Sequence, residues 1–189
     1  MRYFESYGNP SDNIQNGDIQ VMQNIFLGNF CDKGIYSLEV ILLLFAFKVK
    51  YPNFIYLIRG HHEDKNINEI NGLGYECAIR LFEDISEKNS IFNLINDVFN
   101  LLPFGVLVDN SMLLISGGFG SSIETLDQIN NIKRPCSLVQ SIENMEQFIP
   151  YDLLWSEYHD EVENFDVNFR KDLTHTAFAV NYGKKRLNA

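Results

Sequence analysis

Three short apolar stretches of this chain each end in a polar turn that contains glycine. "IFL" leads into Gly28–Gly34, "FIYLI" into Arg59–Glu63, and "MLLI" into Ser116–Gly118. Aromatic and β-branched residues favour strands, while glycine favours the turns that close them. Polar turns keep their backbone groups in contact with water most easily at a shared rim. We therefore expect an α/β fold in which these three turns converge on one site.

The pattern between the turns predicts helices that alternate with the strands. Strands are expected over residues 25–30 and 54–60, followed by a β-hairpin within 105–118 that turns on Asp109–Ser111. Apolar residues at helical spacing predict helices over 38–50, 67–87, 90–102 and 122–132. Ser37 is expected to cap the first of these helices.

Composition narrows the classes of function. The 189 residues are enough for one domain, and the formal net charge of −10 argues against binding to nucleic acid, which needs clustered Lys and Arg. The three cysteines, Cys31, Cys77 and Cys136, form no C-x-x-C pair, so we expect free thiols in a reducing compartment, cytoplasmic or nuclear. The most apolar run, 38–47, is too short to span a bilayer, so no membrane association is expected.

The three turns and their surroundings resemble the phosphoprotein phosphatase family of serine/threonine phosphatases. "FLGNFCDKGIYSLEVILLLFAFKVKYPNFIYLIRGHHE" follows the family pattern FLGD-x-VDRG…SLE…LLL…K…YP…LLRGNHE. Further matches are "INEINGLGYEC", "FNLLPFGVLVDNSMLLISGG" and "DLLWSE", and "GGFGSSIETLDQINNIKRP" is most similar to the subgroup that carries kelch repeats. The likeness extends over about residues 20–183.

The resemblance implies a fold, a reaction and a cofactor. The fold would be the calcineurin-like phosphoesterase fold, a β-sandwich of mixed sheets flanked by helices. Residues 1–189 would form a single partial domain, incomplete at both ends. The family hydrolyses phosphoserine or phosphothreonine with two divalent metals (Mn, Fe or Zn) that activate a bridging water and neutralise phosphoryl oxygens.

The resemblance also implies six metal-ligand positions, and none holds the family's residue. Two would precede Met1 and one would follow Ala189. At the remaining three, Asn29 replaces the bridging aspartate, His61 replaces an asparagine, and Ser116 replaces a histidine. A neutral amide cannot compensate the charge of two cations as a carboxylate does. We therefore expect no tightly bound metal. The plainer alternative is that Asn29, His61 and Ser116 are ordinary turn residues without any role at a metal site.

Other positions of the family's active site keep their chemistry. His62 matches the general acid that protonates the leaving alkoxide, and Asp32 matches the carboxylate that orients it. Lys33 stands where the family has a phosphate-binding arginine. A lysine keeps the positive charge but lacks the two-pronged hydrogen bonding of a guanidinium. Arg170 falls near a second such arginine. A purely structural pairing of Asp32 with His62 remains the alternative.

Three hypotheses follow from this pattern. The favoured one is a pseudophosphatase that binds a protein or phosphopeptide partner without turning it over. The second is an active metal-dependent phosphatase whose ends are supplied elsewhere. The third is a decayed fragment without a function. Missing strands would leave open sheet edges, and such edges favour aggregation.

Overall fold

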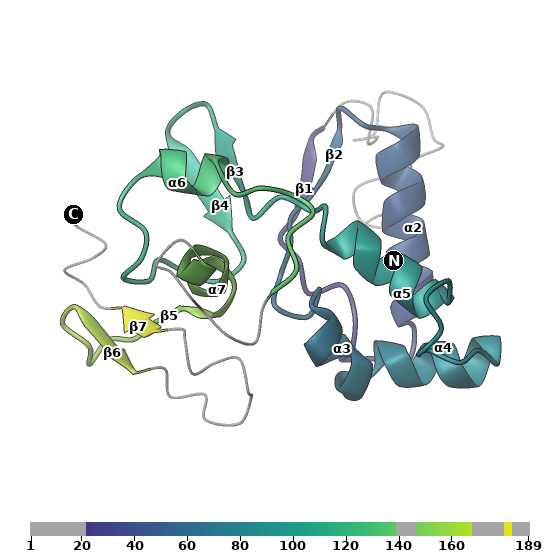
Figure 1. Cartoon of the computed structure of the whole chain (residues 1–189). Coiled ribbons are helices and arrows are strands. Elements are labelled where there is room, and N and C mark those ends of the chain that lie inside the picture. Colours follow the sequence, from purple (N-terminus) through teal and green to yellow (C-terminus); the bar gives the residue numbers. More distant parts are fainter. Residues whose placement is uncertain (1–21, 139–146, 168–179, 183–189) are drawn as a thin grey trace.

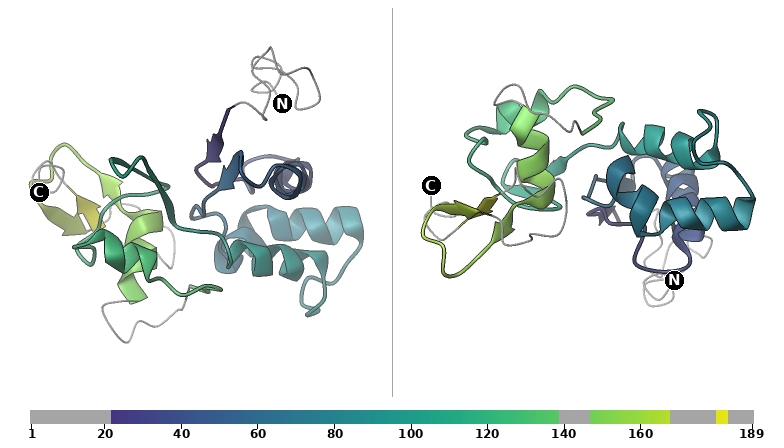
Figure 2. Two further views of the ribbon diagram at one scale, coloured as in Figure 1. Left: turned by 90° about the horizontal axis from the view of Figure 1, so that it is seen from above. Right: turned by 60° about the horizontal axis from the view of Figure 1, so that its bottom comes forward.

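The computed structural model describes residues 22–138, 147–167 and 180–182, which form two lobes side by side (Figures 1 and 2). The first lobe comprises β1 (Asn24–Phe26), α2 (Ser37–Lys50), β2 (Ile55–Leu57), α3 (Lys65–Asn71), α4 (Leu73–Leu81) and α5 (Ile91–Phe99). β1 and β2 pair in parallel, with Ile25 opposite Tyr56. The parallel pair brings the ends of both strands, and therefore the first two turns, to the same edge.

The second lobe follows from residue 105. It comprises β3 (Gly105–Val108), β4 (Met112–Ile115), α6 (Leu126–Asn130), α7 (Phe148–Trp155), β5 (Glu157–Tyr158), β6 (Phe165–Val167) and β7 (Val180–Tyr182). β3 and β4 form the expected hairpin, which turns at Asp109 and Asn110, both with positive φ. In the third sheet, β7 lies between β5 and β6.

Each lobe has its own apolar core. The first core buries Ile41, Ile55 and Phe92 against one another, and the second gathers around Trp155 and Phe104. Arg59 joins the two lobes, because its buried guanidinium donates to the carbonyl of Cys136 while its backbone N–H donates to the carbonyl of Pro103. Within the described ranges, every helix is too short or too polar to span a membrane.

The start of α2 differs from the expectation that Ser37 caps it. Ser37 is the first helical residue, and its hydroxyl accepts a hydrogen bond from the N–H of Asp32. The first N–H groups of the helix, those of Ser37 and Leu38, donate instead to the carboxylate of Glu76 in α4, at 2.9 and 3.3 Å. A carboxylate from a neighbouring helix therefore satisfies groups that local capping would otherwise serve.

The single helix expected over 67–87 is two shorter helices. Gly72 separates α3 from α4, and a Cβ there would lie 2.7 Å from the carbonyl oxygen of Asp32, so only glycine allows this close contact. α4 ends at Phe82, whose φ of 54° is left-handed and stops the helix. Residues 82–90 are not helical, and Ser90 then caps α5 by accepting from the N–H of Asn93.

The strands are shorter than the apolar stretches that predicted them. β1 and β2 have three residues each, and the described strands form three small sheets of two, two and three strands. The helix expected over 122–132 is also short, because α6 covers only Leu126–Asn130. The alternation of strands and helices, and the mixed parallel and antiparallel pairing, agree with the expected fold class.

Candidate functional site: a cavity between the two lobes

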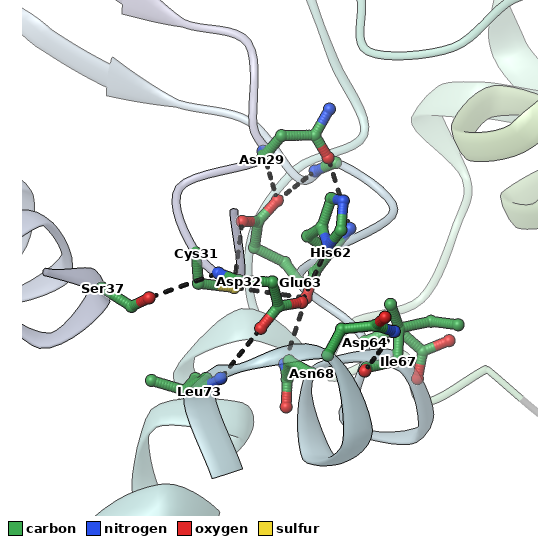
Figure 3. A network of polar contacts seen from close by, with 12 residues as sticks. Asn29, Cys31, Asp32, Ser37, His62, Glu63, Asp64, Ile67, Asn68 and Leu73 are labelled. Atoms are coloured by element: carbon green, nitrogen blue, oxygen red, sulfur yellow. Dashed lines mark hydrogen bonds and ion pairs between the residues drawn. The ribbon is translucent and has the colours of Figure 1, made fainter. Parts of the chain in front are cut away.

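The carboxylate of Glu63 holds the first two turns together (Figure 3). Its Oε2 accepts from the N–H groups of Asn29 and Gly60 at 2.7 and 2.8 Å, and its Oε1 accepts from the N–H of Phe30 at 2.6 Å. Glu63 is fully buried, and burial raises its pKa, although the three N–H donors oppose that shift. One buried side chain thus fixes the backbone of both turns.

Glycine allows the two turns to touch. Gly28 has φ of +89°, and a Cβ on it would lie 2.3 Å from the backbone nitrogen of Gly60. Asn29 and Asp32 also have positive φ, at 60° and 77°. Asn and Asp tolerate the left-handed region better than most residues, so this turn suits its sequence.

Asp32 and His62 form a buried pair. The Asp32 Oδ2 atom lies 2.7 Å from His62 Nδ1, and the Asp32 Oδ1 atom accepts from the N–H of Leu73 at 3.0 Å (Figure 3). The backbone N–H of His62 donates to the Asn29 side chain at 3.3 Å. The structure therefore brings the two expected partners together, and the same pair also ties the turns to the start of α4.

Residues from all three turns line one cavity of about 530 Å³ between the lobes. The first lobe contributes Asn29 and His61, and the second contributes Ser116. The complete lining is Asn29, His61, Ser116, Gly117, Leu154, Ser156, Glu157 and Tyr158. The three degenerate ligand positions therefore converge, as their placement in the sequence predicts.

The third turn reaches the cavity by packing on the end of α7. The N–H of Gly117 donates to the carbonyl of Leu153 at 2.9 Å, and a Cβ on Gly117 would lie 2.7 Å from that oxygen. The Ser116 hydroxyl is buried and has no hydrogen-bond partner among the described residues. An unpartnered buried hydroxyl can still bind a polar group that enters the cavity.

His61 and His62 face different surroundings. The His61 ring packs between the rings of Trp155 and His62, with 4.5 Å between centroids in both contacts. It is partly exposed and lines the cavity, whereas His62 is only 6% exposed and is held by Asp32. The two adjacent imidazoles therefore have separate roles, one at the cavity wall and one inside the turn framework.

Lys33, one of the two expected phosphate-binding residues, is not among the residues that line this cavity. Lys33 is exposed and lines a separate, larger groove beside α2, which shares Asn29 with the cavity. Arg170 lies outside the described residues. The structure thus places Asn29, His61 and Ser116 together and Lys33 on an adjoining surface.

Sequence reasoning missed several residues of the site. Ser156, Glu157 and Tyr158 line the cavity, and the only hint was that Ser156 and Glu157 end the "DLLWSE" motif. Cys31 lies beside the site, but burial next to Glu63 and Asp32 raises the pKa of its thiol far above the usual range. A raised pKa disfavours the thiolate, which is the nucleophilic form of cysteine.

Comparisons with known proteins agree with this architecture. The model of the calcineurin-like phosphoesterase family matches residues 4–184. The chain is 38% identical over 172 residues to serine/threonine-protein phosphatase BSL2 of Arabidopsis thaliana, covering 90% of this chain and 16% of that protein. A solved protein serine/threonine phosphatase of Saccharomyces cerevisiae, described as similar to human phosphatase PP5, matches with a TM-score of 0.72 at 26% identity.

That structural match covers 96% of this chain and 49% of the yeast chain, so the chain spans only part of the relatives that it matches. The family model nevertheless extends over nearly all residues of this chain, including the three turns that meet at the cavity. The chain belongs to the calcineurin-like phosphoesterase family, and the relatives that it matches are named serine/threonine protein phosphatases.

Proposed function

We propose that this chain is a serine/threonine phosphatase-like domain that binds a protein or phosphopeptide partner without hydrolysing it. The observation that carries the proposal is Asn29. It occupies the position of the family's bridging carboxylate, faces the cavity together with His61 and Ser116, and accepts a hydrogen bond from the N–H of His62 through its amide oxygen.

The donors in the cavity do not fit a centre of two divalent ions. Asn29, His61 and Ser116 supply an amide, an imidazole and a hydroxyl, none of which is anionic at neutral pH. Glu157 is the one carboxylate in the described lining. Two cations held close together need anionic oxygens between them, and hard oxygen ligands are the ones that Mn²⁺ and Mg²⁺ prefer.

The hydrogen bonds that hold the residues around the cavity support a role in binding a ligand. Glu63 still joins the first two turns, Asp32 still orients His62, and Gly117 still packs on α7. A cavity of about 530 Å³ lined by amide, hydroxyl and imidazole groups has the size and polarity of a site for a peptide side chain. This arrangement favours recognition over turnover.

The cysteines support an intracellular setting for this function. Cys31, Cys77 and Cys136 are all free thiols, and two of them are buried. Free thiols persist in reducing compartments such as the cytoplasm and the nucleus. We infer that the partner is met there.

Hydrolysis assays test the proposal. With excess Mn²⁺, the protein should release phosphate from a phosphoserine peptide, and p-nitrophenol from p-nitrophenyl phosphate, at the rate of a His62→Ala variant. The physical reason is that Asn29, at the position of the family's bridging carboxylate, supplies a neutral amide. A wild-type rate clearly above that of the variant would show that the chain is an active phosphatase.

A further inference from the structure

Two pockets adjoin each other where the first and second lobes meet, with lining residues distinct from those of the cavity. One, of about 450 Å³, is lined by residues of α6, β3 and β4; the other, of about 350 Å³, is lined by residues of β2, β3 and the end of α5. Pro103 and Arg134 line both pockets. We call the two pockets together the Arg134 groove.

Most side chains that line the groove are apolar, and several of them are exposed; besides Arg134, the polar members of the lining are Lys48, Tyr56, Asp127 and Asn130. Leu107 and Leu126 in the α6 pocket are 43% and 50% exposed, and Val98 and Leu101 in the α5 pocket are 38% and 53% exposed. Exposed apolar side chains that gather in adjoining pockets are typical of recognition surfaces. Each pocket is large enough to receive an aliphatic or aromatic side chain.

The geometry of β3 places the two pockets on opposite faces of a strand. Val106 lines the α5 pocket, and the next residue, Leu107, lines the α6 pocket, because successive side chains of a strand point to opposite faces. In the part of the chain that the structure describes, β3 pairs only with β4. An extended peptide beside β3 would present its own side chains to both faces alternately, as in strand addition.

Arg134 adds a charge between the pockets. It is exposed, and its Nη1 atom donates to the carbonyl of Leu101 at 3.1 Å, which fixes the guanidinium at the groove. No carboxylate of the described residues lies within salt-bridge distance of it. A fixed guanidinium with remaining donors is suited to a carboxylate of a ligand.

We propose that the Arg134 groove binds an extended peptide segment of a partner protein, in which an acidic residue stands between two apolar residues. The apolar side chains enter the two pockets, and the acidic side chain pairs with Arg134. Apolar anchors supply affinity, while the charged pair sets register and specificity. This surface shares no lining residue with the cavity of the phosphatase-like site, so binding here does not depend on the fate of that site.

Synthetic peptides test this proposal. Fluorescein-labelled peptides would carry one Glu between two Leu residues, with Ser elsewhere and the Leu–Glu spacing varied, and binding would be measured by fluorescence anisotropy. We expect at least one spacing to bind saturably. Changing the peptide Glu to Gln, or Arg134→Gln in the protein, should each weaken binding about tenfold, since a hydrogen bond to a charged group is lost. Both changes together should cost little more than either alone.

Variants of the protein distinguish peptide binding at the groove from binding at other exposed apolar residues. Leu107→Asp and Val98→Asp should each abolish measurable binding, because each places a charge in one of the pockets. Val49→Asp is the matched control, since Val49 is 83% exposed on α2 and lines neither pocket. Equal melting temperatures of the variants confirm that the fold is intact.

Three results would overturn the proposal. They are the absence of binding at every spacing, equal binding of the Glu and Gln peptides, and a concentration-dependent dimer in sedimentation that Leu107→Asp dissociates. The last result would assign the groove to a second copy of this chain.

Discussion

Replacing Gly28 with alanine is expected to lower the free energy of unfolding by about 3 kcal/mol or more. The new Cβ would lie 2.3 Å from the nitrogen and 2.6 Å from the Cα of Gly60, and both are backbone atoms that cannot rotate away. In addition, φ of +89° is unfavourable for any residue with a Cβ. The first two turns must therefore separate, and the contacts between Asn29 and the second turn weaken with them.

Gly34→Ala is the matched control, because it lies in the same turn. No atom lies within 4 Å of a Cβ built at Gly34. We expect this variant to be neutral or slightly more stable, since alanine lowers the entropy of the unfolded chain. Urea denaturation followed by circular dichroism measures both variants. Equal stability of Gly28→Ala and Gly34→Ala would contradict the close contact of the two turns.

Glu63→Ala is expected to cost about 3–5 kcal/mol, and it will leave much of the protein unfolded if the domain is only marginally stable. The substitution removes the acceptor of three backbone N–H groups, those of Asn29, Phe30 and Gly60, and leaves them buried or partly buried without a partner. Glu63→Gln should cost less, because its remaining oxygen still accepts.

Glu69→Ala serves as the control for Glu63→Ala. Glu69 is an exposed glutamate on the neighbouring helix α3, so its replacement should change stability by less than about 0.5 kcal/mol. Thermal unfolding and amide hydrogen exchange at the turns measure the difference. Unchanged exchange rates at Asn29 and Gly60 in Glu63→Ala would show that the carboxylate does not hold the turns.

The site could be predicted from the sequence because its elements are local. Apolar stretches closed by glycine-containing turns predicted the presence of β1, β2 and β4, although β1 and β2 end at Phe26 and Leu57, before the expected ends. The convergence of Asn29, His61 and Ser116 on one cavity follows from that pattern. The pairing of Asp32 with His62 came from the family resemblance, because the two residues are far apart in the sequence.

The other features of the fold depend on contacts between residues far apart in the sequence, which a local sequence pattern does not reveal. Glu76 satisfies the start of α2 from another helix, and the periodicity of 67–87 does not show that Gly72 must pack on Asp32. Tertiary contacts override helix propensity at such points. The buried role of Glu63 likewise appears only once the two turns are placed against each other.

Asn29 is both part of the hydrogen-bonded turn and part of the cavity wall. Its φ of 60° suits an asparagine, its N–H is held by Glu63, and its amide faces the cavity. The turn is therefore kept in place while the side chain that it presents to the cavity is a neutral amide.

Counting bound metal ions tests this account most directly. Calorimetric titration with Mn²⁺ should show no tight site for two ions in the wild-type protein. The double variant Asn29→Asp with Ser116→His restores an anionic oxygen and an imidazole at the cavity, and it should bind Mn²⁺ measurably more tightly. Two ions bound to the wild-type chain with micromolar or better affinity would contradict the loss of the metal centre.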